Sequence, residues 1–228
     1  MAITLGAITF DPARTRVREK HAETGGHLGR HIEISGTVLA ENAPEEVEAA
    51  LDAILAAASN EDFTAALSLR DGRRLFVRRA GFTREVCRDS RAGAFVLDLE
   101  SRDPFEEAAI GYSLPWAITA SGATKSCPTL GNAPTAPVFH VGASGTLVNP
   151  GFSDGARTIR YWGSINPATT LTFDGAARKV IRDGLDATAY TTGEFPAIFP
   201  GNTTITYTDD PASSHQLNVF VVYADRWW

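Results

Sequence analysis

Paired carboxylates are the first residues in this sequence that could do chemistry, because two neighbouring acids can divide the roles of general acid and general base. The pairs Glu106-Glu107 and Asp209-Asp210 are each adjacent in sequence. Adjacent residues of an extended chain point to opposite sides, so we interpret both pairs as solvated turn residues. No Gly-x-Ser-x-Gly elbow, glycine-rich phosphate loop or His-Glu-x-x-His motif accompanies them. The sequence predicts no catalytic residue and no enzyme.

Histidine and cysteine are the next candidates, as metal ligands. His21, His27 and His31 fall in one polar segment, but no cluster of cysteines or acids at ligand spacing accompanies them. Cys87 and Cys127 form neither a zinc motif nor a disulfide framework. We expect no metal site, no cofactor, and two separate reduced thiols.

Basic and aromatic residues could bind nucleic acid or sugar. Arg73-Arg74 and Arg78-Arg79 flank an apolar strand, but the net charge of −6 opposes binding to phosphates, so we interpret them as solvated strand ends. Trp116 and Trp162 fall among predicted strands and are expected in the core. Trp227-Trp228 ends the chain; it either packs on its own domain or enters a neighbouring subunit. Sugar stacking ranks below both interpretations.

Composition sets the class of protein. The chain has 228 residues, of which 43% are hydrophobic and 21% charged, as in ordinary globular proteins. No apolar run approaches the ~18 residues that a membrane helix needs. The start of the chain lacks the basic residues and long apolar core of a signal peptide.

The elements that would position these residues differ between the two halves. In the first half, residues 31–39 alternate as a strand, and residues 44–58 carry one apolar helical stripe with Asn42 as the expected cap. Asp71-Gly72 predicts a hairpin, and a second one joins strands at 82–87 and 94–100. Residues 14–31 read as a long loop or an extended hairpin. We therefore expect residues 1–105 to form an α+β domain with a mainly antiparallel sheet and one helix.

In the second half, short strand candidates alternate with glycine-rich turns and no helix is indicated. This spacing is typical of an antiparallel β-sandwich, here expected over residues 106–228. The last strand, 217–223, is apolar on both faces, so both are expected to be covered. The fold class is therefore mainly β. The segment 94–105, a strand ended by Asp103-Pro104, marks the domain boundary.

The order of these pieces resembles the distal tail proteins of long-tailed bacteriophages. The resemblance spans nearly the whole chain and rests on short segments in order: 32–38, the helix from Pro44, the hairpin 67–77, 95–105, Gly131-Asn132-Ala133-Pro134, Pro137-Val138-Phe139, Asn149-Pro150, 171–174, 199–202, 221–223 and Arg226-Trp227.

The resemblance implies a tube-like N-terminal domain in a hexameric ring and a galectin-like β-sandwich outside it. It implies a virion structural protein, assembled in the bacterial cytoplasm, that joins the tail tube protein to a tail tip, hub or baseplate protein. DNA passes through the lumen unbound, and there is no enzyme activity. The polar arm 14–31 is a candidate for reaching an adjacent subunit. The alternatives are a lectin-like carbohydrate-binding module, a β-sandwich hydrolase of unfamiliar type, and a tube protein proper.

Overall fold

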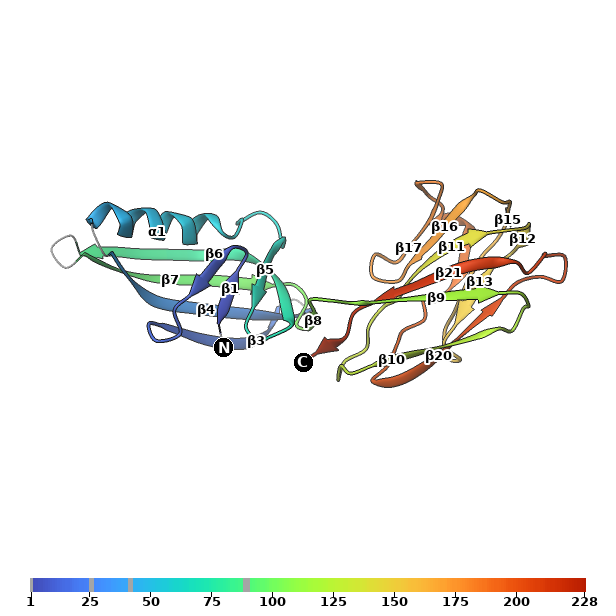
Figure 1. The fold of residues 1–228 in the computed structure, drawn as a ribbon, viewed down its shortest axis with the longest axis horizontal. Coiled ribbons are helices and arrows are strands. Elements are labelled where there is room, and N and C mark those ends of the chain that lie inside the picture. The colour runs from blue at the N-terminus through green and yellow to red at the C-terminus, as the bar shows by residue number, and fades with distance from the viewer. Residues whose placement is uncertain (1, 25–26, 41–42, 88–90) are drawn as a thin grey trace. The chain divides into compact units, whose positions relative to one another are not determined.

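The computed structural model describes residues 2–24, 27–40, 43–87 and 91–228. The chain divides into two compact units, Met1–Ala109 together with Trp228, and Ile110–Trp227 (Figure 1). The division follows Ala109 rather than Phe105, because β8 (Glu106–Ala108) pairs with the N-terminal strand β6. Both units are built from antiparallel strands, so the predicted mainly β fold is confirmed. In the part of the chain that is described, no helix has the length and hydropathy needed to cross a membrane.

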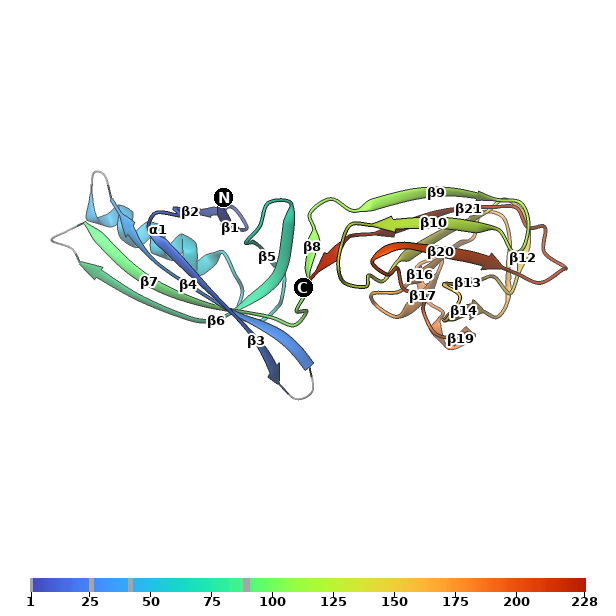
Figure 2. The same cartoon turned by 90° about the horizontal axis from the view of Figure 1, so that it is seen from below.

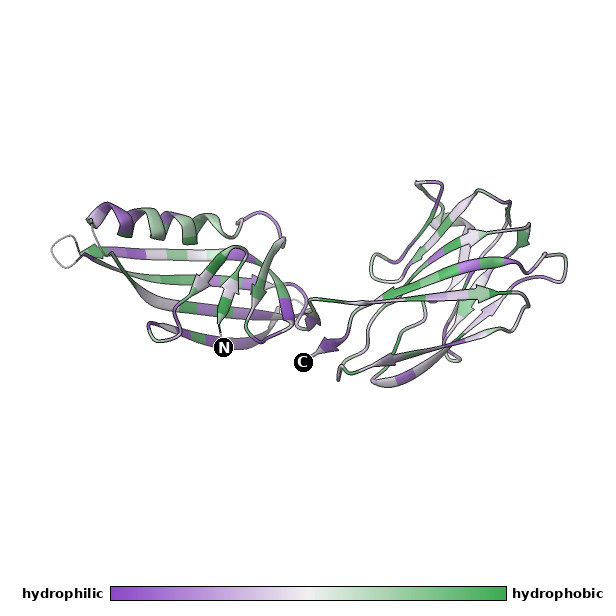
Figure 3. Cartoon of the chain, viewed as in Figure 1, coloured by the Kyte–Doolittle hydropathy of each residue, from purple (hydrophilic) through white to green (hydrophobic). Residues whose placement is uncertain are grey.

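The N-terminal unit is one helix on a curled sheet of strand order β2-β1-β5-β6-β7-β4-β3. Its elements are β1 Ile3–Leu5, β2 Ile8–Phe10, β3 Thr15–Thr24, β4 His27–Leu39, α1 Pro44–Ala56, β5 Ala65–Ser68, β6 Arg73–Cys87, β7 Ala92–Ser101 and β8. Hydrophobic and hydrophilic residues alternate along β6 and β7 (Figure 3). The predicted segment 14–31 is an extended hairpin of β3 and β4, which projects from the rest of the sheet (Figure 2).

The two hairpins predicted after residue 65 are both present, and they share strand β6. The first, across Asp71-Gly72, is confirmed by the pairing of β5 with β6. The predicted strands on either side of Ala80 are, however, one strand, with an irregularity between Arg79 and Gly81. A bulge bends a strand and increases its twist. Residues 75–77 of β6 pair with β5, and β6 pairs with β7 from Arg78 onward.

Helix α1 confirms the apolar stripe. Val47, Leu51 and Ile54 are buried, and the helix packs mainly on β7. Asn42, the predicted cap, lies outside the described residues. The cap position is Ala43, whose side chain makes no capping hydrogen bond, and Pro44 opens the first turn.

The C-terminal unit is a sandwich of two sheets with orders β10-β20-β13-β14-β19 and β18-β17-β16-β11-β21-β9. Its strands are β9 Tyr112–Ile118, β10 Thr124–Thr129, β11 Val138–Ala143, β12 Leu147–Val148, β13 Gly151–Ser153, β14 Thr158–Tyr161, β15 Ser164–Ile165, β16 Thr170–Asp174, β17 Lys179–Arg182, β18 Leu185–Asp186, β19 Thr191–Gly193, β20 Gly201–Thr208, β21 Leu217–Tyr223 and β22 Arg226–Trp227, with a 3₁₀ turn η2 at Thr188–Tyr190. Strands β12 and β15 pair with each other.

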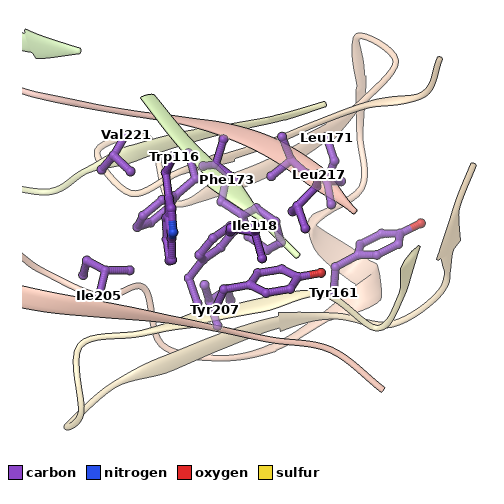
Figure 4. Packing of buried hydrophobic residues seen from close by; sticks show 14 of the residues in the cluster. Trp116, Ile118, Tyr161, Leu171, Phe173, Ile205, Tyr207, Leu217 and Val221 are labelled. Atoms are coloured by element: carbon purple, nitrogen blue, oxygen red, sulfur yellow. The ribbon is translucent and has the colours of Figure 1, made fainter. Parts of the chain in front are cut away.

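Aromatic rings fill the space between the two sheets (Figure 4). Phe152 of β13 stacks on Phe139 of β11 with ring centroids 4.2 Å apart, and Tyr207 lies 5.6 Å from the same ring. One expectation about β21 is wrong: its inner face is buried, but Phe220 on the outer face is 49% exposed. Its neighbours there in β11 and β9 are His140 and Pro115, which leave the ring uncovered.

Candidate assembly interface

The four-stranded part of the N-terminal sheet, β6-β7-β4-β3, has two faces of opposite character. One face is apolar and buried under α1, through Ile32, Ile34, Phe95, Leu97 and Leu99. Gly93 lets the helix approach β7, because a Cβ atom there would lie only 2.6 Å from Cγ1 of Val47. The helix and this glycine therefore fix which face of the sheet stays open.

The opposite face is polar and carries charges of both signs. Three acid–base contacts cross it between adjacent strands: Arg18 to Glu33 at 3.5 Å, His31 to Asp98 at 3.7 Å, and Arg78 to Glu100. All six side chains are between 32% and 70% exposed. A surface with interspersed charges attracts neither phosphate nor cations strongly. It can border water without gripping a polyanion.

Both outer edges of this four-stranded sheet are open. Among the described residues, no strand pairs with the outer side of β3, or with the outer side of β6 between Gly81 and Cys87. An open edge presents a row of amides and carbonyls and is a template for another strand.

The direction of the edge amides follows from the register. The Thr37 amide donates to the Arg14 carbonyl, so the pair 14/37 and every second pair onward is hydrogen-bonded between β3 and β4. The amides of residues 15, 17, 19 and 21 therefore point outward. The same alternation continues from β4 to β7 and from β7 to β6, because hydrogen-bonded pairs alternate along each pair of strands. The amides of residues 82, 84 and 86 of β6 therefore point away from β7, toward the open edge.

A buried ion cluster holds the base of the β3–β4 hairpin. Arg30 is 2% exposed and lies 3.1 Å from Glu106 and 3.3 Å from Glu19. Arg70 also pairs with both acids, and Arg73 lies 3.7 Å from Glu106. Because a buried ion pair is costly to break, the cluster fixes β3 and β4 against β8 where the hairpin leaves the sheet. Whether the arm beyond it reaches a neighbour stays a prediction.

The acidic pairs are not the solvated turns that their adjacency indicated. Glu106 is buried in the ion cluster. The Asp209 side chain is also buried; it accepts a hydrogen bond from the Tyr207 hydroxyl at 2.9 Å and lies 2.8 Å from His215. Both roles depend on partners distant in sequence or loop geometry, which a local pattern cannot reveal.

The predicted histidines and cysteines are spread along the strands. His31 faces Lys20 across the hairpin and His21 faces Arg30, while the side chain of His27 lies outside the described residues. Among the described residues, no three His, Cys, Asp or Glu side chains lie close enough together to hold a metal ion. Cys87 is exposed, Cys127 is buried, and no disulfide joins them.

The paired arginines are engaged in the N-terminal unit rather than solvated. Arg74 pairs with Glu107 at 2.8 Å and Arg78 pairs with Glu100, while Arg79 donates to the carbonyl of Leu55 near the end of α1. The charges of Arg74 and Arg78 are therefore compensated locally.

The tryptophans divide differently from expectation. Trp116 is buried as predicted, but Trp162 is 47% exposed, which corrects the expectation that it is core. Its indole nitrogen donates to the Thr192 hydroxyl at 2.8 Å, which ties the ring to β19 instead. Trp228 is grouped with the N-terminal unit and lies edge-on to Phe105, with ring centroids 4.3 Å apart.

Comparison with known proteins gives a family match for part of the chain and a structural match for all of it. Residues 130–227 match the family model described as siphovirus-type tail component, C-terminal domain. No curated protein matches the chain in sequence. A crystal structure of SPP1 Dit (gp 19.1), described as a paradigm of the hub adsorption apparatus in phages that infect Gram-positive bacteria, superposes with a TM-score of 0.69 at 12% identity. That match covers 100% of this chain and 99% of the other. The predicted resemblance to distal tail proteins is confirmed, as is the fold that it implied.

Proposed function

We propose that this chain, which carries the C-terminal domain of siphovirus-type tail components and has the fold of SPP1 Dit, is a structural tail protein that forms a closed ring through its N-terminal unit. The ring joins the tail tube to the tail tip or baseplate. In this proposal the N-terminal unit makes the ring and the sandwich lies at its periphery.

The observation that carries this proposal is the pair of open edges on one four-stranded sheet. Strands β6, β7, β4 and β3 alternate in direction, so β3 runs opposite to β6. A rotated second copy then brings its β6 antiparallel to β3 of the first. One heterologous contact, repeated by rotation, closes into a ring and leaves no edge.

The two faces of the sheet supply the inside and the outside of this ring. The face under α1 is already covered, so the polar face lines the lumen. Charges of both signs there, in a chain of net charge −6, let DNA pass without being held. The protein acts by assembly and not as an enzyme, and its ring is a hexamer that contacts a tail tube protein on one side and a hub or baseplate protein on the other.

The test is a mass measurement of the purified chain, alone and with a tail tube partner, by light scattering and negative-stain electron microscopy. We expect rings of six times the 24.4 kDa protomer mass. In the variant Val17→Pro, the ring is lost while β3 and β4 stay paired, because the amide of residue 17 points to the open edge.

The matched control is Val17→Ala, which trims the same side chain but keeps the edge amide, and which should still form rings. A chain that stays monomeric at high concentration and with its tail partners would overturn the proposal. Rings that persist in Val17→Pro would show that a different surface closes them.

A further inference from the structure

The two open edges also determine how neighbouring copies align, provided that the proposed ring exists. We infer that β3 of one copy pairs with β6 of the next at a stagger of four residues, so that Arg18 faces Glu85, Glu19 faces Arg84 and Val17 faces Val86 of the neighbour. The partner is a second copy of this chain. Three independent features of the sheet lead to this register.

The first feature is the parity of the edge amides. On β3 the outward amides belong to residues 15, 17, 19 and 21, and on β6 to residues 82, 84 and 86. All of these side chains lie on the face toward α1. Only registers that pair an odd residue of β3 with an even residue of β6 satisfy both the hydrogen bonds and the two faces. Arg16, Ser35, Val96 and Thr83 lie opposite one another in one row across the four strands of a copy. We define the stagger as the number of residues by which the residue of the next copy's β6 that faces Arg16 is displaced from Thr83. The stagger is therefore zero, two, four or six residues.

The second feature is closure. Strands in a closed barrel tilt by roughly 35–45° to its axis. With strands about 4.8 Å apart and a rise of about 3.3 Å per residue, a stagger of two, four or six residues over four strands gives tilts of about 20°, 35° and 45°. This relation does not depend on the number of copies. Staggers of zero and two residues are too small.

The third feature is the chemistry of the facing side chains, which separates four from six. At four residues, Arg18 faces Glu85 on the lumen side, and Glu19 faces Arg84 on the helix side. The other helix-side pairs are His21 with Phe82 and Val17 with Val86, and the two valines are half-buried at the margin of the core. At six residues, Lys20 takes the place of Arg18 opposite Glu85, but on the helix side His21 faces Arg84 and Glu19 faces Val86. The helix-side ion pair and the apolar pair are then both lost.

The charges at these positions are available for such contacts. Arg18 is 70% exposed, and its one ion pair among the described residues is with Glu33, at 3.5 Å. Glu85 is exposed and forms no ion pair within the described part of its own copy. Arg84 is paired with Asp52 of α1, but a guanidinium has five donors and can serve two carboxylates. Cross-strand ion pairs of this kind select the register as well as the partner.

Cysteine scanning against the native Cys87 tests the register directly. A stagger of four places Arg16 opposite Cys87 of the neighbour in a non-hydrogen-bonded pair, where cross-strand Cα atoms are about 4.5 Å apart and a disulfide can form. With copper phenanthroline as oxidant, the Arg16→Cys variant should give a ladder of covalent oligomers on a non-reducing gel. Arg14→Cys and Arg18→Cys should not. Cys127 is buried and does not compete, and adding Cys87→Ser should abolish the ladder.

The outcomes separate this inference from the proposed ring. Cross-linking in Arg14→Cys or Arg18→Cys instead of Arg16→Cys means a stagger of two or six residues and overturns the register, while the ring stands. Absence of rings in the unmodified chain by light scattering overturns the proposed function itself.

Charge exchange supplies a second readout that needs no cysteine. Arg18→Glu and Glu85→Arg should each weaken ring association at least tenfold, and the double variant should recover most of that loss. The control Glu61→Arg, an exposed change away from both edges, should leave association unchanged. A double variant that is no better than the worse single variant overturns the Arg18–Glu85 contact.

Discussion

The two units solve the problem of sheet edges in opposite ways. The sandwich has four edge strands: β9 and β10 contain Pro115 and Pro128, and β18 and β19 have only two and three residues. Proline offers no amide to a partner, and very short strands offer little template. In the N-terminal unit, the ten residues of β3 and residues 81–87 of β6 contain no proline.

This difference indicates which part of the chain is built to associate. Both units bury continuous cores of aliphatic and aromatic residues, so stability alone does not distinguish them. An edge left long and unguarded in a natural protein needs a reason, because it invites aggregation. We propose that the reason is pairing of this edge with a strand of a second copy of the chain.

The largest expected effect comes from disrupting the packing of helix α1 on the sheet with the open edges. Leu51→Asp places a carboxylate at a site of α1 with no exposed area, which should cost about 4 kcal/mol or more. Calorimetry should show loss of the N-terminal transition while the sandwich transition stays. Glu48→Lys, on the exposed side of the same helix, should shift neither by more than about 0.5 kcal/mol. Loss of both transitions in Leu51→Asp would mean that the units do not fold separately.

An intermediate effect is expected from replacing the proline that blocks pairing at an edge strand of the sandwich. Pro128→Val restores an amide on the outer side of β10, because the Tyr207 amide donates to the Ala123 carbonyl and alternation then points residue 128 outward. Concentration-dependent association should appear in sedimentation. Thr124→Val, which adds apolar surface at an outward amide that already exists, is the control and should associate less. Equal association of both variants would show that hydrophobicity, not the missing donor, guards this edge.

The sequence predicted the strands and helix of the N-terminal unit better than it predicted the proposed interface. The alternation at 31–39, the stripe on α1 and the Asp71-Gly72 turn are local patterns, and each appears in the structure. The continuity of β6 was missed because Ala80 interrupts the alternation at the bulge.

Buried charges and open edges could not have been predicted in the same way. Glu106 is buried because Arg30, far away in the chain, meets it, and adjacency to Glu107 carries no sign of that partner. Whether an edge is open depends on which strands lie beside it, and this is a property of topology. The absence of proline from β3 and β6 was visible in the sequence, but it acquires meaning only once both are known to be edges.

The smallest expected effect is a difference between the two units in how their stability responds to alkaline pH. All five tyrosines and the buried Cys127 lie in the sandwich. Burial raises the pKa of the Cys127 thiol to about 11, and burial together with Asp209 raises the pKa of Tyr207 well above its ordinary value. The unfolded chain releases these protons at lower pH than the folded one. Stability is therefore complete below the unfolded pKa values, near 9 to 10, and falls as the pH rises toward the folded values.

Between pH 7.5 and pH 10 the sandwich transition should accordingly fall by a few degrees, for a loss on the order of 1 kcal/mol, while the N-terminal transition changes less. Cys127→Ala removes one of the titrating groups and should flatten the pH dependence of the sandwich transition, although the variant starts from a lower melting temperature. If the N-terminal transition fell first, the buried thiol and hydroxyls of the sandwich would not be the groups that dominate the alkaline response, and this prediction would be wrong.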